Sequence, residues 1–439
     1  MRTLRAGVVG AGFSGAQHID ALRRLPGVEV VILAAGSETH AAQAARLSGV
    51  ERWSADWQEL TGAADLDVIH VCAPNHLHLP VALAALRAGK HVICEKPLAL
   101  QVSEGEQLAA AAARTDRLTI LCHNYRFFAM VAELRARIAS GDLGAVHGVH
   151  GRYLQDWLIS PTSTNWRVDP NRGGPSRTVA DIGTHWIDLA EVSTGLRLEA
   201  VMAQLGTVHP RRPAPSGERT FQADGDGTHA GGTGDWAPVT TEDRASLLLR
   251  FEGGVPGSLT LSQVAAGRKN DLELTVEGNA GSATWRQEQP DQLWIGRSGG
   301  PNELHLRDPA TLSPSAARLA QLPAGHNQGW SDALRNLLDG AYARIRGESP
   351  RSDDVPLPTF ADGVRHLAFV RATLQSAREE RWVRIEGRTE PGSARVAEAA
   401  GLSQDGADRA DRADRAERAD RADRAVGGAA SIRRSRAAR

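Results

Sequence analysis

Short apolar runs alternate with helical segments through the first 140 residues, and this alternation restricts the fold more than any other feature. The runs themselves do not alternate with polar residues, which is typical of strands covered on both faces by crossover helices. The pattern therefore predicts a doubly wound parallel sheet over residues 1–126. The expected strands cover residues 4–9, 28–34, 51–53, 67–73, 91–95 and 118–123, and the expected helices lie near residues 14–24, 38–48, 56–61, 77–88 and 103–114.

The pattern changes after a helix expected near residues 127–140. Several strands then follow one another between residues 198 and 297 without intervening helices, which indicates a mostly antiparallel sheet. We therefore expect an α+β domain with a large open sheet over residues 127–386. Within it, residues 210–237 are rich in Gly and Pro and predict a long mobile surface insertion, to which no structure is assigned. Further elements are expected at residues 145–155 (strand), 175–194 (one helix), 329–346 and 359–378 (helices) and 382–385 (strand).

Residues 387–439 form a low-complexity tail. Its residues 407–424 are six triplets, Ala-Asp-Arg five times and Ala-Glu-Arg once. On a helix each three-residue step drifts by about 60°, so no persistent face forms that could be buried. A disordered tail is favoured over an isolated exposed helix.

Composition and charge exclude several classes of protein. The 51 Lys+Arg and 52 Asp+Glu leave a formal charge of −1, which argues against a nucleic-acid or membrane-surface binder. No apolar run approaches the ~18 residues that cross a bilayer. The strand-like residues 4–9 leave no room for a secretory signal, which predicts a cytoplasmic protein. Cys72, Cys94 and Cys122 lack CxxC spacing, so we expect buried apolar side chains and no metal site.

The sequence Gly10-Ala11-Gly12-Phe13-Ser14-Gly15 follows the first strand and opens the first helix. Gly10 would make the tight turn, Gly12 would let the backbone approach a pyrophosphate, and Gly15 would let helix and strand pack closely. The helix N-terminus would face the anion. This context predicts a dinucleotide-binding Rossmann domain over a merely structural glycine turn.

The end of the second strand, Ala35-Gly36-Ser37, carries no acidic residue that would bind the ribose 2′-hydroxyl and repel a 2′-phosphate. His40 is the nearest possible cation, and no Arg or Lys stands beside it. NADP is therefore slightly favoured. The alternative is NAD, with its ribose held by the backbone.

Two further motifs carry candidate catalytic groups. Glu95-Lys96-Pro97 places Lys96 just beyond a strand end, where open α/β sheets bind ligands, although an ordinary surface lysine is the alternative. On the helix at residues 175–194, Asp181, His185 and Asp188 fall on one edge of the apolar face. A neutral imidazole there can accept a hydroxyl proton while Asp181 stabilises the imidazolium. The alternative is an Asp that stabilises the helix and a half-exposed His. Gly183, inside this helix, suggests close passage of substrate or cofactor.

Together these motifs resemble the glucose-fructose oxidoreductase and inositol dehydrogenase family, Gfo/Idh/MocA, over residues 4–385. The resemblance rests on residues 10–15, on Ala73-Pro74-Asn75-His76-Leu77-His78, on residues 88–97 and on Asp181-Ile182-Gly183-Thr184-His185. It implies Lys96, Asp181 and His185 as the catalytic set. It also implies a homo-oligomer, a dimer or tetramer, paired through the open sheet. The nicotinamide contacts that it implies come from Ala73, Pro74, Asn75, His76, Glu95, Asn124 and Arg126.

The resemblance also implies the reaction, which is reversible oxidation of a secondary alcohol on a sugar or cyclic polyol. His185 would remove the hydroxyl proton, Lys96 would polarise that oxygen, and Asp181 would orient the pair. Side chains suited to carbohydrate are Gln155, Trp166, Arg167 and His326, although such aromatics are more often core and His326 could cap the following helix. Two other functions stay open: an NAD-assisted glycosidase or lyase, and a non-catalytic dinucleotide sensor.

We expect truncation at Gly387 to leave melting temperature, turnover and oligomer mass nearly unchanged. The tail has few large apolar residues to bury, and every candidate catalytic group precedes residue 330. A fall of several degrees in melting temperature, or dissociation into monomers, would show that the tail docks on the folded body or bridges subunits.

Overall fold

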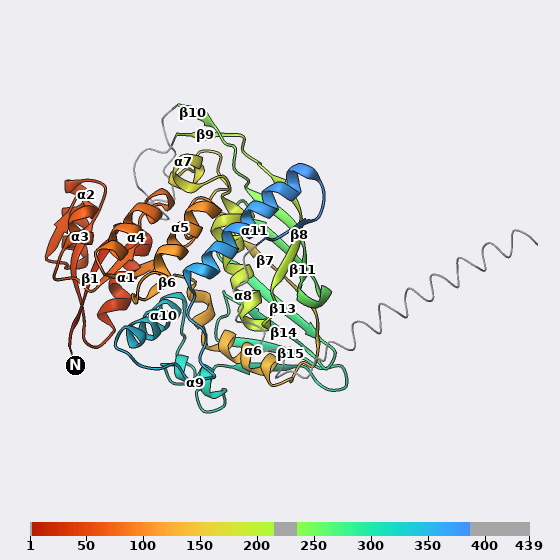
Figure 1. Ribbon diagram of the computed structural model, residues 1–439. Coiled ribbons are helices and arrows are strands. Elements are labelled where there is room, and N and C mark those ends of the chain that lie inside the picture. Colours follow the sequence, from red (N-terminus) through yellow and green to blue (C-terminus); the bar gives the residue numbers. More distant parts are fainter. Residues whose placement is uncertain (1, 215–234, 387–439) are drawn as a thin grey trace, which may run out of the picture. The chain divides into compact units, whose positions relative to one another are not determined.

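The computed structural model describes residues 2–214 and 235–386 (Figure 1). The tail of residues 387–439 and most of the insertion expected at residues 210–237 lie outside the described residues. The expectations for those two segments therefore stay predictions.

Six strands of the described chain form a wholly parallel sheet in the order β3-β2-β1-β4-β5-β6, which confirms the doubly wound sheet. From β1 the chain adds β2 and β3 on one side and then β4, β5 and β6 on the other, so the strand order reverses between β1 and β4. Open α/β sheets bind ligands at the carboxyl ends of the strands at such a point. The strands are β1 (Leu4–Val9), β2 (Val28–Ala34), β3 (Arg52–Ser54), β4 (Val68–Val71), β5 (His91–Cys94) and β6 (Thr119–Leu121). The helices between them are α1 (Phe13–Arg23), α2 (Glu38–Ser48), α3 (Trp57–Gly62), α4 (His78–Arg87) and α5 (Val102–Ala112).

Both faces of this sheet are buried, as the unalternated apolar strands predict. On β1, Val8 and Val9 point to opposite faces. Val8 belongs to a core cluster with Leu22 of α1, and Val9 belongs to another with Leu60 of α3 and Val81 of α4. The carboxyl edge of the sheet is thus left as the accessible place for a ligand.

A second sheet of nine strands in the described chain is antiparallel except where β12 pairs with β7, which confirms the mostly antiparallel open sheet. One face packs against α6, α8 and α11 around Trp186 and Trp285, whereas Leu248 and Trp294 are exposed on the sheet. The order is β16-β15-β14-β13-β7-β12-β11-β8-β17. The strands are β7 (Val146–Leu154), β8 (Leu198–Gly206), β11 (Arg244–Phe251), β12 (Pro256–Ser262), β13 (Asp271–Gly278), β14 (Ser282–Arg286), β15 (Gln292–Gly296), β16 (Glu303–Leu306) and β17 (Val383–Arg384), and the helices are α6 (Ala129–Ala139), α8 (Thr184–Thr194) and α11 (Phe360–Glu379).

The last helices join the two sheets. After α9 (Pro314–Leu319), α10 (Trp330–Ile345) places Leu338 in the same cluster as Val8 of the first sheet. In α11, Leu367 packs with the first sheet, and Phe369 packs with the second. Figure 1 shows α11 running between α5 and β8. Both layers therefore share helices from the end of the chain.

A two-stranded ribbon, β9 (Arg211–Pro213) with β10 (Trp236–Pro238), flanks the undescribed part of the insertion. Sequence analysis assigned no structure there because Gly and Pro dominate the segment. Arg212 of β9 is fully buried, and it donates to the carbonyls of Leu158, Ser160 and Ser163. Its guanidinium also binds Asp243, so the ribbon is tied to the domain by buried hydrogen bonds.

The remaining elements are short. They are α7 (Pro170–Gly173), a π-helical turn at Val179–Gly183, and 3-10 turns at Asn75–Leu77, Asn124–Phe127, Trp166–Val168 and Glu252–Gly254. No helix within residues 2–214 and 235–386 is both long enough and apolar enough to cross a bilayer.

Candidate active site

A cleft follows the carboxyl edge of the parallel sheet. It begins at the loops after β1 and β2 and reaches the loop after β5, where residues from the second domain complete it. Its lining is residues 9–14, 34–36, 55, 57, 72–75, 77, 78, 95, 96, 166 and 167. The cleft thus joins the glycine turn to Lys96, which sequence analysis assigned to separate roles.

The glycine turn fits a dinucleotide pyrophosphate. Gly10 has φ +112°, and a Cβ there would lie 2.4 Å from the carbonyl oxygen of Cys72. A Cβ on Gly15 would lie 1.9 Å from the carbonyl oxygen of Gly10, so helix and turn pack as closely as predicted. Gly12 is the N-cap of α1 and has no side chain to occupy the first-turn amides. Those amides are left for an anion at the helix N-terminus.

The adenosine end of the cleft is small and uncharged. Ala35 and Gly36 line it, whereas the Ser37 hydroxyl caps α2 by accepting from the His40 amide. Among the described residues that line the cleft, the positive charges are Lys96 and Arg167. Both lie near the end of β5, three strands from the end of β2.

Lys96 and Asp181 form the ion pair at the other end of the cleft. The Lys96 ammonium donates to Asp181 Oδ1 at 2.8 Å and to its backbone carbonyl at 2.9 Å. Gln263 donates to the other carboxylate oxygen at 2.9 Å, and the Arg167 guanidinium lies 3.5 Å from Oδ1. Burial would raise the pKa of Asp181, but these cations and hydrogen bonds lower it to about 2. Asp181 is therefore a permanent carboxylate that fixes the lysine, not a partner of His185.

His185 lies one turn beyond Asp181 and is 7% exposed. Its ring centroid lies 4.6 Å from that of Tyr125 and 5.2 Å from that of His123. Burial and the Lys96 charge hold the pKa of His185 well below its ordinary value. The imidazole is therefore neutral at neutral pH and can act as a base.

The helix that carries these residues is positioned from its N-terminus. It begins with the π-helical turn Val179–Gly183 and continues as α8, in place of the single α-helix expected. The Glu242 carboxylate accepts from the amides of Arg177 and Val179 and so caps the first turn. A Cβ at Gly183 would lie 2.8 Å from Leu261 of β12. The glycine thus permits close helix–sheet packing, which accounts for it without a ligand, and close passage of a ligand stays a prediction.

Asp188 does not join Asp181 and His185. It forms a buried ion pair with Arg126, whose Nε donates to Asp188 Oδ2 at 2.7 Å. Arg126 and Asn124 are buried, and neither belongs to the cleft lining. The placement of these two residues therefore does not support the cofactor contact expected of them.

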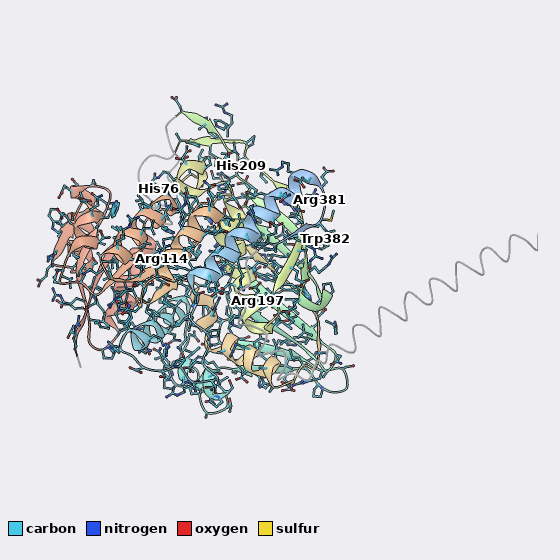
Figure 2. All side chains as sticks on the ribbon, in the orientation of Figure 1. His76, Arg114, Arg197, His209, Arg381 and Trp382 are labelled. Atoms are coloured by element: carbon cyan, nitrogen blue, oxygen red, sulfur yellow. The ribbon has the colours of Figure 1, made fainter. Side chains whose placement is uncertain are left out.

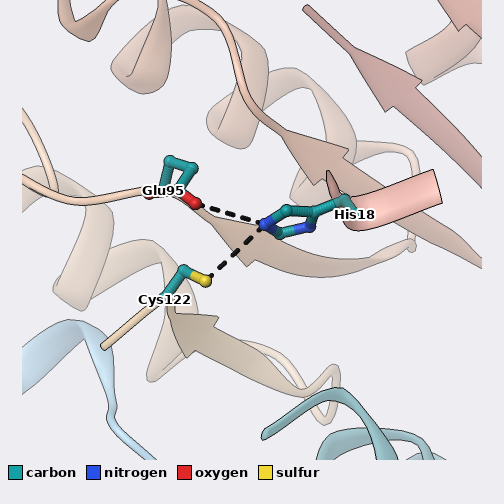
Figure 3. A group of neighbouring side chains, drawn as sticks. All are labelled: His18, Glu95 and Cys122. Carbon is teal, nitrogen blue, oxygen red and sulfur yellow. Dashed lines mark hydrogen bonds and ion pairs between the residues drawn. The ribbon is translucent and has the colours of Figure 1, made fainter. Parts of the chain in front are cut away.

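Glu95 is held by a chain of histidines that sequence analysis missed, and Figure 3 shows its first member, His18. His18 Nε2 lies 3.2 Å from Glu95 Oε1, and its Nδ1 lies 2.8 Å from His70 Nδ1. His70 continues the chain to the Tyr342 hydroxyl at 3.0 Å. Burial would raise the pKa of Glu95, but the bond to His18 and the Lys96 charge lower it. The only sequence signal for this chain is a histidine on the buried face of α1 and another within β4.

Cys122 lies 3.6 Å from His18 Nε2 in this group (Figure 3). Burial and the nearby Glu95 carboxylate raise the pKa of its thiol well above the usual value. A protonated thiol is a poor metal ligand. Both His18 nitrogens already have partners, so the group reads as a hydrogen-bond network.

The other predicted contacts divide into two sets. Ala73, Pro74 and Asn75 line the cleft, and the Asn75 amide donates to the Gly173 carbonyl at 2.9 Å. His76 lies beside α7, outside the cleft lining (Figure 2). Three of the four predicted residues of this loop thus line the cleft, and their contact with a cofactor stays a prediction.

The predicted substrate residues are also divided. Trp166 and Arg167 line the cleft, with the guanidinium 4.4 Å from the indole centroid. Gln155 donates to Asn270 Oδ1 at 3.0 Å. His326 is exposed in the loop before α10, where its carbonyl accepts from Arg307, and it does not line the cleft. The spacing of residues in the sequence could not show that His326 lies away from the cleft, because the path of its loop depends on the contact with Arg307.

A group of linked polar side chains lies beside His185. The Tyr125 and Tyr153 hydroxyls lie 2.7 Å apart, and Tyr153 donates to Asn270 Oδ1 at 2.6 Å. Tyr125 follows β6 of the first sheet, whereas Tyr153 is on β7 of the second, so their contact depends on how the two sheets pack. Both tyrosine rings pack near the imidazole, with centroids 4.6 Å (Tyr125) and 6.5 Å (Tyr153) from it.

Comparison with known proteins identifies two family matches. Residues 4–123 match the oxidoreductase family with the NAD-binding Rossmann fold, and residues 131–284 match the GFO/IDH/MocA C-terminal domain. Levoglucosan dehydrogenase of Pseudarthrobacter phenanthrenivorans is 34% identical over 399 residues, covering 88% of this chain and 99% of that protein.

Solved structures agree with these matches. Levoglucosan dehydrogenase in complex with NADH and levoglucosan has a TM-score of 0.77 at 29% identity, covering 88% of this chain and all of that one. An inositol dehydrogenase homologue complexed with NAD+ from Azotobacter vinelandii has a TM-score of 0.76 at 27% identity, covering 87% of this chain and 97% of that one. Both family matches, and a relative matched over nearly its whole length, show that this chain is an NAD-binding oxidoreductase of the Gfo/Idh/MocA family.

Proposed function

We propose that the chain oxidises a secondary hydroxyl of a sugar, foremost an anhydrosugar of the levoglucosan type, and passes the hydride to NAD. The observation that carries the proposal is the buried Lys96–Asp181 ion pair, whose lysine lines the end of a cleft that begins at a dinucleotide turn. His185 lies one helical turn beyond Asp181 and feels the Lys96 charge, although neither Asp181 nor His185 is among the residues that line the cleft. The similarity to levoglucosan dehydrogenase over nearly the whole of that protein supports the substrate class.

In this proposal, His185 is the base. Its neutral imidazole accepts the hydroxyl proton as the C–O bond gains carbonyl character. A bound nicotinamide would accept the hydride from the same carbon. The aromatic faces of Tyr125 and Tyr153 keep bulk water from the imidazole.

Lys96 polarises the reacting oxygen. An ammonium group has three protons to donate, and two of these bind the carboxylate and carbonyl of Asp181. The third is left for the substrate oxygen, whose developing negative charge the lysine stabilises. Asp181 positions Lys96 and balances its charge, which revises the role expected for it as a stabiliser of the imidazolium.

The alternative functions use the same cleft. A non-catalytic sensor has no use for a buried neutral base beside a fixed ammonium, so the pairing of His185 with Lys96 disfavours it. An NAD-assisted glycosidase or lyase would use the same hydride chemistry but return the hydride before product leaves. Accumulation of reduced cofactor separates the two reactions.

The cofactor in this proposal is NAD. The slight preference for NADP drawn from Ala35-Gly36-Ser37 has no support in the relatives with bound cofactor, which carry NADH or NAD+. The described lining at that end holds no cation to neutralise a 2′-phosphate, and the Ser37 hydroxyl already accepts the His40 amide. We therefore propose that backbone groups hold the adenosine ribose of NAD.

The substrate and cofactor are tested by supplying levoglucosan and other anhydrosugars, free monosaccharides and inositols, each with NAD and with NADP. We expect reduced cofactor to accumulate with NAD and with a pyranose or anhydropyranose, because the uncharged loop after β2 offers a phosphate no cation. Ala35→Asp is the matched variant, and it should weaken NADP further by charge repulsion while sparing NAD. A preference for NADP in the wild type, or hydrolysis without net reduction, would contradict the proposal.

Lys96→Ala and His185→Ala should each lower kcat by at least ~10²-fold, the usual contribution of a positioned acid or base. Cofactor affinity should be largely kept, because the glycine turn is untouched. His147→Ala, an exposed histidine on β7, is the control and should turn over normally. Turnover in either active-site variant close to that of the wild type would remove that residue from the mechanism.

The rate of oxidation should be insensitive to pH where an ordinary histidine titrates. Because the pKa of His185 is lowered, its neutral, basic form persists below about 6.5, the usual histidine pKa. We expect kcat/KM to stay level as pH falls through that value. In Lys96→Ala a nearby positive charge is lost, so the His185 pKa rises and the acid limb of the residual activity moves to higher pH. A wild-type limb near pH 6.5 would refute the neutral-base assignment.

A further inference from the structure

Three histidines form a continuous buried row that leads away from the cleft. His123, two residues after the end of β6, contacts His185 with ring centroids 5.2 Å apart, and it contacts His366 of α11 with centroids 4.6 Å apart. Both contacts are edge-on. All three rings are buried. The row therefore starts at the proposed base and runs into the layer between the two sheets.

The row is unusual in its hydrogen bonding. Within the described part of the chain, His185 Nδ1 and both ring nitrogens of His123 and of His366 are buried and make no hydrogen bond to protein. In the network beside Glu95, by contrast, both nitrogens of His18 and of His70 have partners. Buried polar atoms are normally satisfied by protein or by ordered water. Five consecutive unsatisfied nitrogens thus indicate positions for bridging water.

The outer end of the row reaches two carboxylates, the buried Asp188 and the partly exposed Asp362, and Arg126 forms an ion pair with each. His366 Nε2 lies 3.4 Å from Asp188 Oδ1, and Asp362 stands one turn before His366 on α11. The Asp362 side chain is 17% exposed. Asp362 Oδ1 lies 3.2 Å from a guanidinium nitrogen of Arg365, which is also partly exposed. A proton arriving at His366 is therefore close to solvent.

The same residues have the types and spacing of a metal site. One ligand atom each from His123, Asp188 and His366 lies within 4.8 Å of the others. However, both Asp188 oxygens already accept from Arg126, and that guanidinium stands beside His123. A divalent cation would add charge next to a buried cation. The surroundings thus favour water over metal.

We propose that His123 and His366, with bridging water, carry the proton from His185 to solvent near Asp362. This inference rests on the proposed alcohol oxidation. The substrate O–H bond breaks and its proton binds one nitrogen of His185, while the hydride takes both C–H electrons to the nicotinamide. The other nitrogen of His185 then releases a proton to His123, and His366 passes one outward, so that one proton reaches water for each hydride transferred.

The charges around the row give the transfer a direction. Lys96 faces His185, so positive charge repels a proton at the inner end, whereas His123 faces the cations Arg126 and Lys96 and the carboxylates Asp362 and Glu95. Asp188 and Asp362 face His366 and attract a proton at the outer end, with Arg365 beside them. Burial lowers the pKa of all three imidazoles, that of His366 to about 3. Each is neutral at rest and able to accept on one nitrogen and donate from the other.

The test measures proton release and hydride transfer together. Wild-type protein loaded with NAD is mixed rapidly with a substrate found in the panel, and a pH-indicator dye is recorded beside the absorbance of reduced nicotinamide. We expect the proton to appear in step with the first hydride transfer. In His123→Phe and in His366→Phe the first hydride transfer should persist, but proton release should lag until product leaves. Added imidazole buffer should shorten the lag.

Phe369→Leu is the packing control, because Phe369 is buried on α11 near His366 but carries no proton. In Phe369→Leu the proton should still be released in step with the first hydride transfer, whatever the effect of the substitution on melting temperature. His366→Phe is the second variant, so the test stays valid if His123→Phe fails to fold. Wild-type timing in the His366 variant overturns the route. Absence of any hydride transfer in the wild type would instead count against the proposed function.

A second measurement does not depend on turnover. A crystal structure of the protein without cofactor should show ordered water within hydrogen-bond distance of the His123 and His366 nitrogens. Elemental analysis of the same protein should find no stoichiometric metal. A dry row of rings, or a bound metal at His123, Asp188 and His366, would overturn the proposal.

Discussion

The ion pair between Lys96 and Asp181 is the contact on which the rest of the site depends. The two residues are 85 positions apart, and they belong to the end of β5 and to the helix of the second domain. The pair therefore defines where the dinucleotide cleft meets the second sheet. Because the lysine also donates to the Asp181 backbone carbonyl, it fixes the helix as well as the side chain. His185, one turn further along, is positioned by the same contact.

The second domain supports this pair with buried charge. Glu242 caps the helix, and the neighbouring Asp243 binds Arg177 at the helix start and Arg212 of β9. Removing one partner from such a buried group leaves an uncompensated charge, which costs about 3–5 kcal/mol. The exact placement of Asp181 is thus set by residues that never touch the cleft.

Much of the fold could be predicted from sequence because its signals are local. The unalternated strands, the glycine turn and the strand-end lysine each depend on a few consecutive residues, and the doubly wound sheet is confirmed. The contents of the site needed tertiary information. Helical spacing grouped Asp188 with His185, but it could not show that Arg126 would take that carboxylate. Likewise, the sequence could not show that Leu261 packs against Gly183, which gives a structural reason for the glycine.

The site separates two electrostatic roles. Two of its carboxylates are paired with fixed cations, Asp181 with Lys96 and Asp188 with Arg126, and the lowered pKa of Asp181 keeps that group ionised at neutral pH. Its imidazoles are buried and neutral, because desolvation penalises the protonated form. Proton exchange is thereby left to the histidines. A base placed at the inner end of such a row needs no carboxylate partner of its own, which explains why Asp181 faces Lys96 while His185 faces His123.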